Sequence, residues 1–140
     1  FTIEVQGRQT HGAMPWAGVD PIVVASQIVV GLQTIVSRQL EIVREPAIVT
    51  VGQIHGGVRF NIIPDSVALE GTVRAFDEAM REDVHARIRR TAEQIAAASG
   101  ATATVRFARF YDVTENPAAL AERMGPTLQR VAGSRPWSAS

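Results

Sequence analysis

The sequence predicts an α+β fold in which four antiparallel strands form one sheet and two helices cover one of its faces. Segments with alternating apolar residues, typical of half-buried strands, occur together with two segments that have apolar residues at helical spacing. Their order along the chain is strand, helix, strand, strand, helix, strand. This order is the ferredoxin-like βαββαβ plan.

The first strand and the first helix occupy residues 1 to 38. Residues 1–7 alternate between apolar and polar side chains, and a loop rich in Gly, His and Pro follows over 8–18. Asp20 and Pro21 start a helix that runs to about Arg38, because Asp caps free N–H groups and Pro is favoured at the first helical position. The helix is apolar around much of its circumference, so we expect one face on the sheet and another on a partner. Its expected core stripe is Ile22, Ala25, Ile28, Val29, Leu32, Ile35 and Val36, with Val24 and Val30 outside it.

The remaining elements follow from the same two patterns. Strands are predicted over 47–54, 66–76 and 101–110, and an amphipathic helix over 78–99 that Gly100 ends. On the strand 66–76, alternate residues point to the core, namely Val67, Leu69, Val73 and Ala75. The helical stripe is Met80, Val84, Ile88, Ala92 and Ile95, and the last strand places Val105 and Phe107 inward.

The chain divides into residues 1–110, which form the four-stranded domain, and residues 111–140, which have no place in it. A helix is predicted from Asn116-Pro117, with Leu120, Met124, Leu128 and Val131 as its stripe and an interruption or kink at Gly125-Pro126. The chain opens in the middle of a strand without an initiator Met. We therefore expect it to be part of a longer protein.

Composition excludes several classes of function. Fourteen basic residues balance fourteen acidic ones among 140, which argues against a nucleic-acid platform. There is no cysteine, and so no disulfide, thiolate metal site or cysteine nucleophile. The apolar runs are too short to span a bilayer, and we expect no membrane contact and a cytoplasmic location.

His11 is the histidine that the pattern favours for function. It lies in the loop Thr-His-Gly-Ala-Met-Pro, where side chains are displayed rather than packed. His55 at a strand end is expected to cap or pack, and His85 on a charged helix to be solvated. The sequence contains no metal-ligand cluster, no phosphate-binding loop and no nucleophile elbow. From the residues alone, the prediction ends at a ferredoxin-like domain with one exposed histidine loop.

Three stretches resemble the aminoacylase, carboxypeptidase and hippurate-hydrolase family of di-zinc amidohydrolases and exopeptidases. They are GRQTHGAMPWAGVDPI at 7–22, TVGQIHGGVRFNIIPD at 50–65 and LEGTVRAFD at 69–77. They occur in the family's order and spacing, and the resemblance covers about residues 1–133. It implies that residues 1–110 are the lid and dimerisation domain. Residues 111–140 would then be the start of the return segment into a catalytic domain.

The resemblance also implies roles for three residues. His11 would stabilise the oxyanion at the scissile carbonyl of a substrate held by the other subunit, and Asn61 and Arg74 would hold the substrate carboxylate. The parent would hydrolyse the amide bond of N-acyl amino acids or similar small carboxylates, as a homodimer. Two zinc or similar divalent ions would lie in its catalytic domain. The chain by itself would hold no metal and be inactive.

Two other functions fit the same topology. A stand-alone ferredoxin-like module could bind a small molecule or a protein partner. An RNA-binding domain would need exposed aromatic residues on the central strands and a basic face. The strands here carry Val, Thr and Ala instead, which disfavours the RNA-binding alternative.

Overall fold

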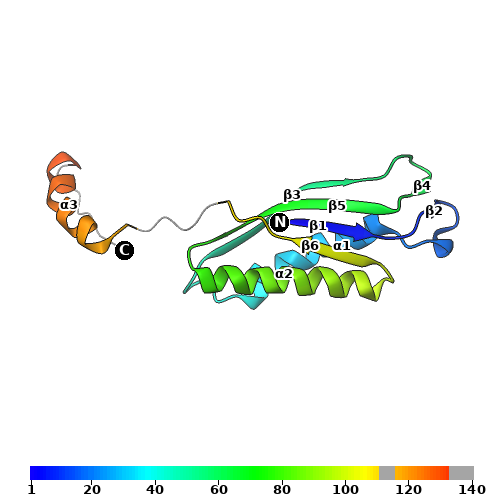
Figure 1. The fold of residues 1–140 in the computed structure, drawn as a ribbon, viewed down its shortest axis with the longest axis horizontal. Coiled ribbons are helices and arrows are strands. Elements are labelled where there is room, and N and C mark those ends of the chain that lie inside the picture. Colours follow the sequence, from blue (N-terminus) through cyan, green and yellow to red (C-terminus); the bar gives the residue numbers. More distant parts are fainter. Residues whose placement is uncertain (111–115, 133–140) are drawn as a thin grey trace. The chain divides into compact units, whose positions relative to one another are not determined.

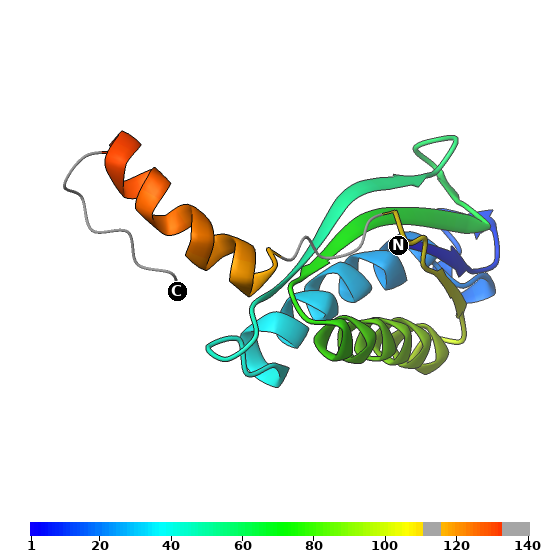
Figure 2. The ribbon, with the colours of Figure 1, turned by 60° about the vertical axis from the view of Figure 1, so that its left-hand side comes forward.

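The computed structural model describes residues 1–110 and 116–132, and it confirms the predicted α+β fold (Figure 1). Four antiparallel strands form a sheet in the order β3-β5-β1-β6. Figure 2 shows both helices, α1 and α2, on the same face of this sheet. The strands are β1 Thr2–Gln6, β3 Ala47–Gly56, β5 Ser66–Ala75 and β6 Thr102–Arg106, and the helices are α1 Pro21–Thr34 and α2 Glu78–Ala98.

Helix α1 begins as the sequence predicts. The Asp20 carboxylate accepts hydrogen bonds from the N–H groups of Ile22 and Val23 at 2.9 and 3.3 Å, and Pro21 is the first helical residue. A π-helical turn, Ile35–Gln39, continues it. Its predicted stripe was wrong at two positions, because Val24 is buried and Ile22 is exposed. Val24 lies one turn before Ile28 and therefore on the same face, whereas Ile22 lies at the edge of that face.

Uninterrupted runs of apolar residues in the sequence are short, but the helical segment Pro21–Gln39 is apolar on average over its whole length. With 19 residues and a mean hydropathy of 1.4, its length and composition alone would suffice to cross a membrane. A third of it is buried within the protein, where α1 contributes Val24, Ala25, Ile28 and Leu32 to the core. A helix that packs on a protein core passes the same test, so length and hydropathy do not by themselves assign this segment to a membrane.

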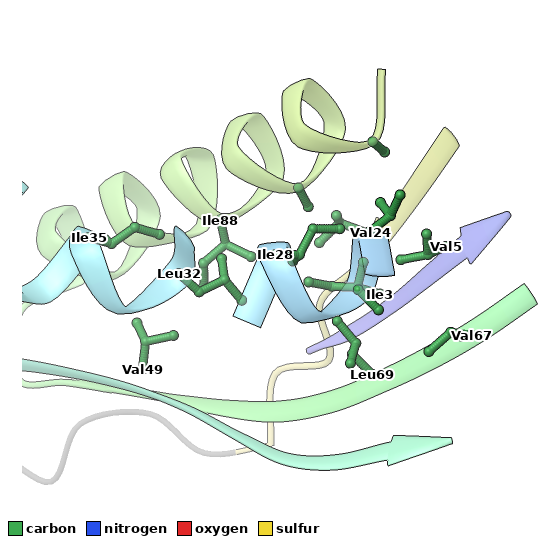
Figure 3. Packing of buried hydrophobic residues seen from close by; sticks show 14 of the residues in the cluster. Ile3, Val5, Val24, Ile28, Leu32, Ile35, Val49, Val67, Leu69 and Ile88 are labelled. Carbon is green, nitrogen blue, oxygen red and sulfur yellow. The ribbon is translucent and has the colours of Figure 1, made fainter. Parts of the chain in front are cut away.

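The core lies between the sheet and the two helices (Figure 3). Ile3, Leu69, Ile28 and Ile88, from two strands and both helices, are fully buried. Helix α2 is capped by the Asp77 carboxylate, which accepts from the N–H of Met80 at 2.7 Å. The described residues bury no polar or charged side chain. Apolar burial alone therefore holds the sheet and the helices together.

The last strand is shorter than predicted. The sequence pattern extended it over 101–110, but β6 ends at Arg106. Its ladder partner is β1, and Thr2 of that strand pairs with Arg106. The next residues, Phe1 and Phe107, approach each other through their rings, with centroids 6.5 Å apart, and are not part of the ladder.

Two short elements were not predicted. Strand β2, Thr10–His11, pairs with strand β4, Ile62–Ile63, in a separate two-stranded ribbon, and a 3₁₀ turn covers Pro15–Ala17. Two-residue strands have too little alternation to be recognised in a sequence. Figure 1 shows this ribbon beyond one end of the main sheet.

The chain forms two compact units, Phe1–Phe110 and Tyr111–Ser140. In the second unit, helix α3 spans Ala118–Ala132 and continues through Pro126, so of the predicted interruption or kink at this site the interruption was wrong. Proline removes one backbone hydrogen bond, and the others along a helix of this length remain. The apolar residues Leu120, Met124, Leu128 and Val131 are exposed. Residues 111–115 and 133–140, which the predicted return segment includes, lie outside the described residues.

Candidate functional site

The β2–β4 ribbon brings His11 and Asn61 together from distant parts of the sequence. His11 pairs with Ile62 in the ribbon, and the N–H of Gly12 donates to the carbonyl oxygen of Asn61 at 2.8 Å. The two residues that the family resemblance singled out in separate motifs are therefore neighbours. Both have exposed side chains.

The loop that carries His11 is held at both ends by the rest of the domain. Arg8 and Val19 exchange two backbone hydrogen bonds of 2.9 and 3.0 Å, which close the loop at its base. The carboxylate of Asp65 accepts the N–H of Gln9 at 2.9 Å, and its carbonyl accepts the N–H of Gly7 at 2.7 Å. These contacts give a surface loop a defined position next to the start of β5.

A backbone group orients the imidazole of His11. The N–H of Ala13 donates to Nδ1 of His11 at 3.1 Å. Because Nδ1 accepts this hydrogen bond, the proton of the neutral ring is on Nε2, which becomes a donor facing outward. The ring contributes nothing to the described core. Its arrangement suits a group that donates a hydrogen bond to a ligand.

Asn61 lies in a tight turn that starts at Arg59. The N–H of Ile62 donates to the carbonyl oxygen of Arg59 at 3.3 Å, which closes a turn around Phe60 and Asn61. A turn role and a binding role of Asn61 are therefore compatible, since its backbone forms the turn while its side chain stays exposed.

Arg74 lies at the other end of the sheet from His11 and Asn61. It pairs with Ile48 near the end of β5, and its side chain is exposed on the strand face away from the helices, as the strand alternation predicted. Arg74 lies eight positions after Ser66, which is at the His11 end of β5, a distance of about 26 Å at about 3.3 Å per residue. Within one copy of the chain, a small ligand cannot touch both Arg74 and His11.

The other two histidines make local contacts. Nε2 of His55 lies 3.0 Å from the side-chain oxygen of Gln53. His85 is not simply solvated, because its ring stacks on Phe107 with centroids 4.0 Å apart. Burial lowers the pKa of His85, and the nearby Arg81 acts in the same direction while Glu82 opposes it. Within residues 1–110 and 116–132, no three His, Asp or Glu side chains form a group that could hold a metal ion.

A pocket beside the ribbon was missed by the sequence reasoning. It has a volume of about 500 Å³ and carries one cationic and one anionic side chain. The only sequence signal was that Arg59 and Asp65 flank the Asn-Ile-Ile-Pro stretch on both sides. The lining residues are Gln9, Gly57, Val58, Arg59, Ile62, Pro64, Asp65 and Ser66.

The fold places the loop with His11 at one end of a four-stranded sheet that two helices cover. In comparison with known proteins, the family model described as peptidase dimerisation domain matches residues 1–100. The chain belongs to this family, which confirms the resemblance found in the sequence.

Its relatives are hydrolases of N-acylated compounds and peptides. N-acetyl-L-cysteine deacetylase of Bacillus subtilis is 48% identical over 76% of this chain, and N-acyl-L-amino acid amidohydrolase of Geobacillus stearothermophilus is 39% identical over 76%. The chain spans 26% and 29% of their lengths. It is thus a dimerisation domain that corresponds to a part of such enzymes. A stand-alone module, the alternative considered from the sequence, is not favoured.

A solved structure supports the same assignment. The Bacillus subtilis YXEP protein, a dinuclear metal binding peptidase from the M20 family, superposes with a TM-score of 0.69 at 29% identity. The superposition covers 94% of this chain and 31% of that protein.

Proposed function

We propose that this chain is the lid and dimerisation part of a homodimeric, metal-dependent amidohydrolase. The enzyme would cleave the amide bond of N-acyl amino acids or similar small carboxylates. The observation that carries this proposal is His11, which is exposed and held by the N–H of Ala13 with its Nε2 proton outward. The activities named for the relatives support the substrate class.

The homodimer is supported by two free surfaces of the domain. Strand β3 is an edge strand, and its outer backbone groups can pair with another strand. Residues 21–37 of α1 and the following turn carry no charged side chain, and Val23 and Val30 are exposed. An uncharged helix face beside an open sheet edge is suited to a two-fold interface.

Two-fold pairing at β3 accounts for the distance between Arg74 and His11. An antiparallel β3–β3 contact reverses the direction of the second sheet. The Arg74 end of one subunit then lies beside the His11 and Asn61 end of the other. A small substrate could in this way contact Arg74 of one chain and His11 of its partner, which one chain alone does not allow.

Each of the three residues has a role that suits its chemistry. Nε2–H of His11 donates to the scissile carbonyl oxygen and stabilises the negative charge that develops there. The planar guanidinium of Arg74 binds the substrate carboxylate with two parallel hydrogen bonds, and the Asn61 amide donates a further one. Two zinc or similar divalent ions are expected in the catalytic part of the parent. The described residues do not fit such a site, and no step through a metal is assigned to them.

Subunit complementation tests the proposal. His11→Ala in the full-length enzyme should lower kcat by about a hundredfold or more, as loss of one oxyanion donor does. Its stability should change by less than about 0.5 kcal/mol, as for ordinary surface substitutions. Mixing this variant with one whose metal site is destroyed should restore activity, because a mixed dimer contains one complete site. If subunits exchange and no activity returns, His11 does not act across the dimer.

A further inference from the structure

The pocket of about 500 Å³ adjoins the β2–β4 ribbon that carries His11. Ile62, which lines the pocket, is the residue opposite His11 in the β2–β4 ribbon. Directly opposed residues of an antiparallel pair have their side chains on the same side, with Cβ atoms about 5 Å apart. A ligand held at Nε2 of His11 therefore has this pocket within reach of its substituents.

Arg59 and Asp65 line the pocket as an unpaired cation and anion. Neither forms an ion pair in the described part of the chain, although both face the same space. One carboxylate oxygen of Asp65 accepts the N–H of Gln9, which fixes the position of that side chain. The charged side chains of the lining therefore sum to no net charge.

The rest of the lining is mainly apolar, and Gln9 and Ser66 add two neutral polar side chains. Val58, Ile62 and Pro64 suit the methylene groups of a ligand, and the charged groups suit its polar end. Arginine offers only hydrogen-bond donors, and an ionised aspartate offers only acceptors. The matching ligand group carries an acceptor and a donor side by side.

We propose that this pocket binds a primary carboxamide or ureido group of the substrate and that Arg59 and Asp65 determine specificity for it. The carbonyl oxygen of the group accepts from Arg59, and its NH₂ donates to Asp65. A carboxylate in the same place meets the charge of Asp65, an ammonium meets that of Arg59, and an alkyl group leaves both unpaired. This inference rests on the proposed amidohydrolase function, since it concerns the substrate of that site.

The test uses isosteric substrates with the full-length enzyme that contains this chain. kcat/KM is measured for N-acetylglutamine, N-acetylglutamate and N-acetylnorleucine. A second set carries the group on the acyl side, with succinamoyl-, succinyl- and pentanoyl-alanine. In one of the two sets, kcat/KM for the carboxamide substrate should exceed that for both analogues by about tenfold. This is the effect expected for two charge-assisted hydrogen bonds in an open pocket.

Two variants separate the roles of the charged residues. Arg59→Met should remove the preference for the carboxamide over the alkyl analogue. Asp65→Asn retains an oxygen for the N–H of Gln9 and should raise kcat/KM for the carboxylate analogue about tenfold by removing the repulsion. The matched control is Arg90→Met on the exposed face of α2, which should leave all ratios unchanged.

The outcomes distinguish the pocket from the proposed function. Hydrolysis of every substrate with equal efficiency, or a preference that Arg59→Met leaves intact, would overturn the specificity role of the pocket and leave the amidohydrolase function standing. Absence of hydrolysis for all substrates would overturn both. A carboxylate preference that Arg59→Met removes would show an anion site and refute the carboxamide assignment.

Discussion

Gly18 leaves no room for a side chain at the base of the His11 loop, so Gly18→Ala should destabilise the domain. A Cβ at this position would lie 2.5 Å from the carbonyl oxygen of Arg8 and 2.5 Å from Cγ2 of Thr10. Real Cβ contacts are essentially never shorter than 3.0 Å, so at least one of these neighbours must move by 0.5 Å or more. The φ of Gly18 is −121°, which alanine adopts freely, and the effect is therefore steric rather than conformational.

The expected cost follows from what the displacement disturbs. The Arg8 carbonyl accepts the N–H of Val19 at 3.0 Å, and this hydrogen bond belongs to the pair that closes the loop. Overpacking against fixed backbone costs about 1–3 kcal/mol, and a weakened hydrogen bond adds about 1 kcal/mol. We expect a loss of about 2–4 kcal/mol, which lowers the melting temperature by roughly 10 °C or more in a domain of this size. Circular dichroism melts and urea titrations of the purified chain measure both quantities.

Gly52→Ala is the matched control for this experiment. Gly52 lies at the register shift of β3, where the nearest atom to an added Cβ is the Glu70 carbonyl oxygen at 3.9 Å. Alanine fits there, and stability should change by less than about 0.5 kcal/mol. If Gly18→Ala were as stable as Gly52→Ala, the loop would not pack against Arg8 and Thr10 as described. The geometric argument for the position of His11 would then fail.

Three further predictions follow from the packing and from the pKa of His85. Leu32→Ala removes a fully buried side chain from the core and should cost about 2–5 kcal/mol in unfolding free energy. Val30→Glu, on the exposed face of α1, should dissociate the full-length dimer in sedimentation experiments while the domain still folds, and an unchanged dimer would argue against this interface. The folded-state pKa of His85 is lowered, so as pH falls through the ordinary value of 6.5 the unfolded chain takes up the proton first and stability decreases. His85→Phe, which keeps the contact with Phe107, should reduce this loss in urea midpoints compared at about pH 7.5 and pH 5.5, and an unchanged pH dependence would assign it to other groups.

The sequence predicted the main elements well because their signals are local. Asp20-Pro21 and Asp77 mark helix starts through hydrogen bonds that span only a few residues. The alternation of β5 predicted which side chains are buried, including the exposed position of Arg74. The pattern failed at the end of β6 and at Ile22, where the outcome depends on which residues of other elements are present to pair or to pack.

For the candidate site, the sequence by itself determined the motifs and the family, and with them the choice of His11, Asn61 and Arg74 as functional candidates. Only the tertiary structure decided that His11 and Asn61 are neighbours, because the two-residue strands that join them are too short to leave a sequence pattern. It also decided that Arg74 lies at the far end of β5 from them and that Arg59 and Asp65 face one pocket. The pairing of His11 with Ile62 joins residues some fifty positions apart, and no local propensity encodes such a contact.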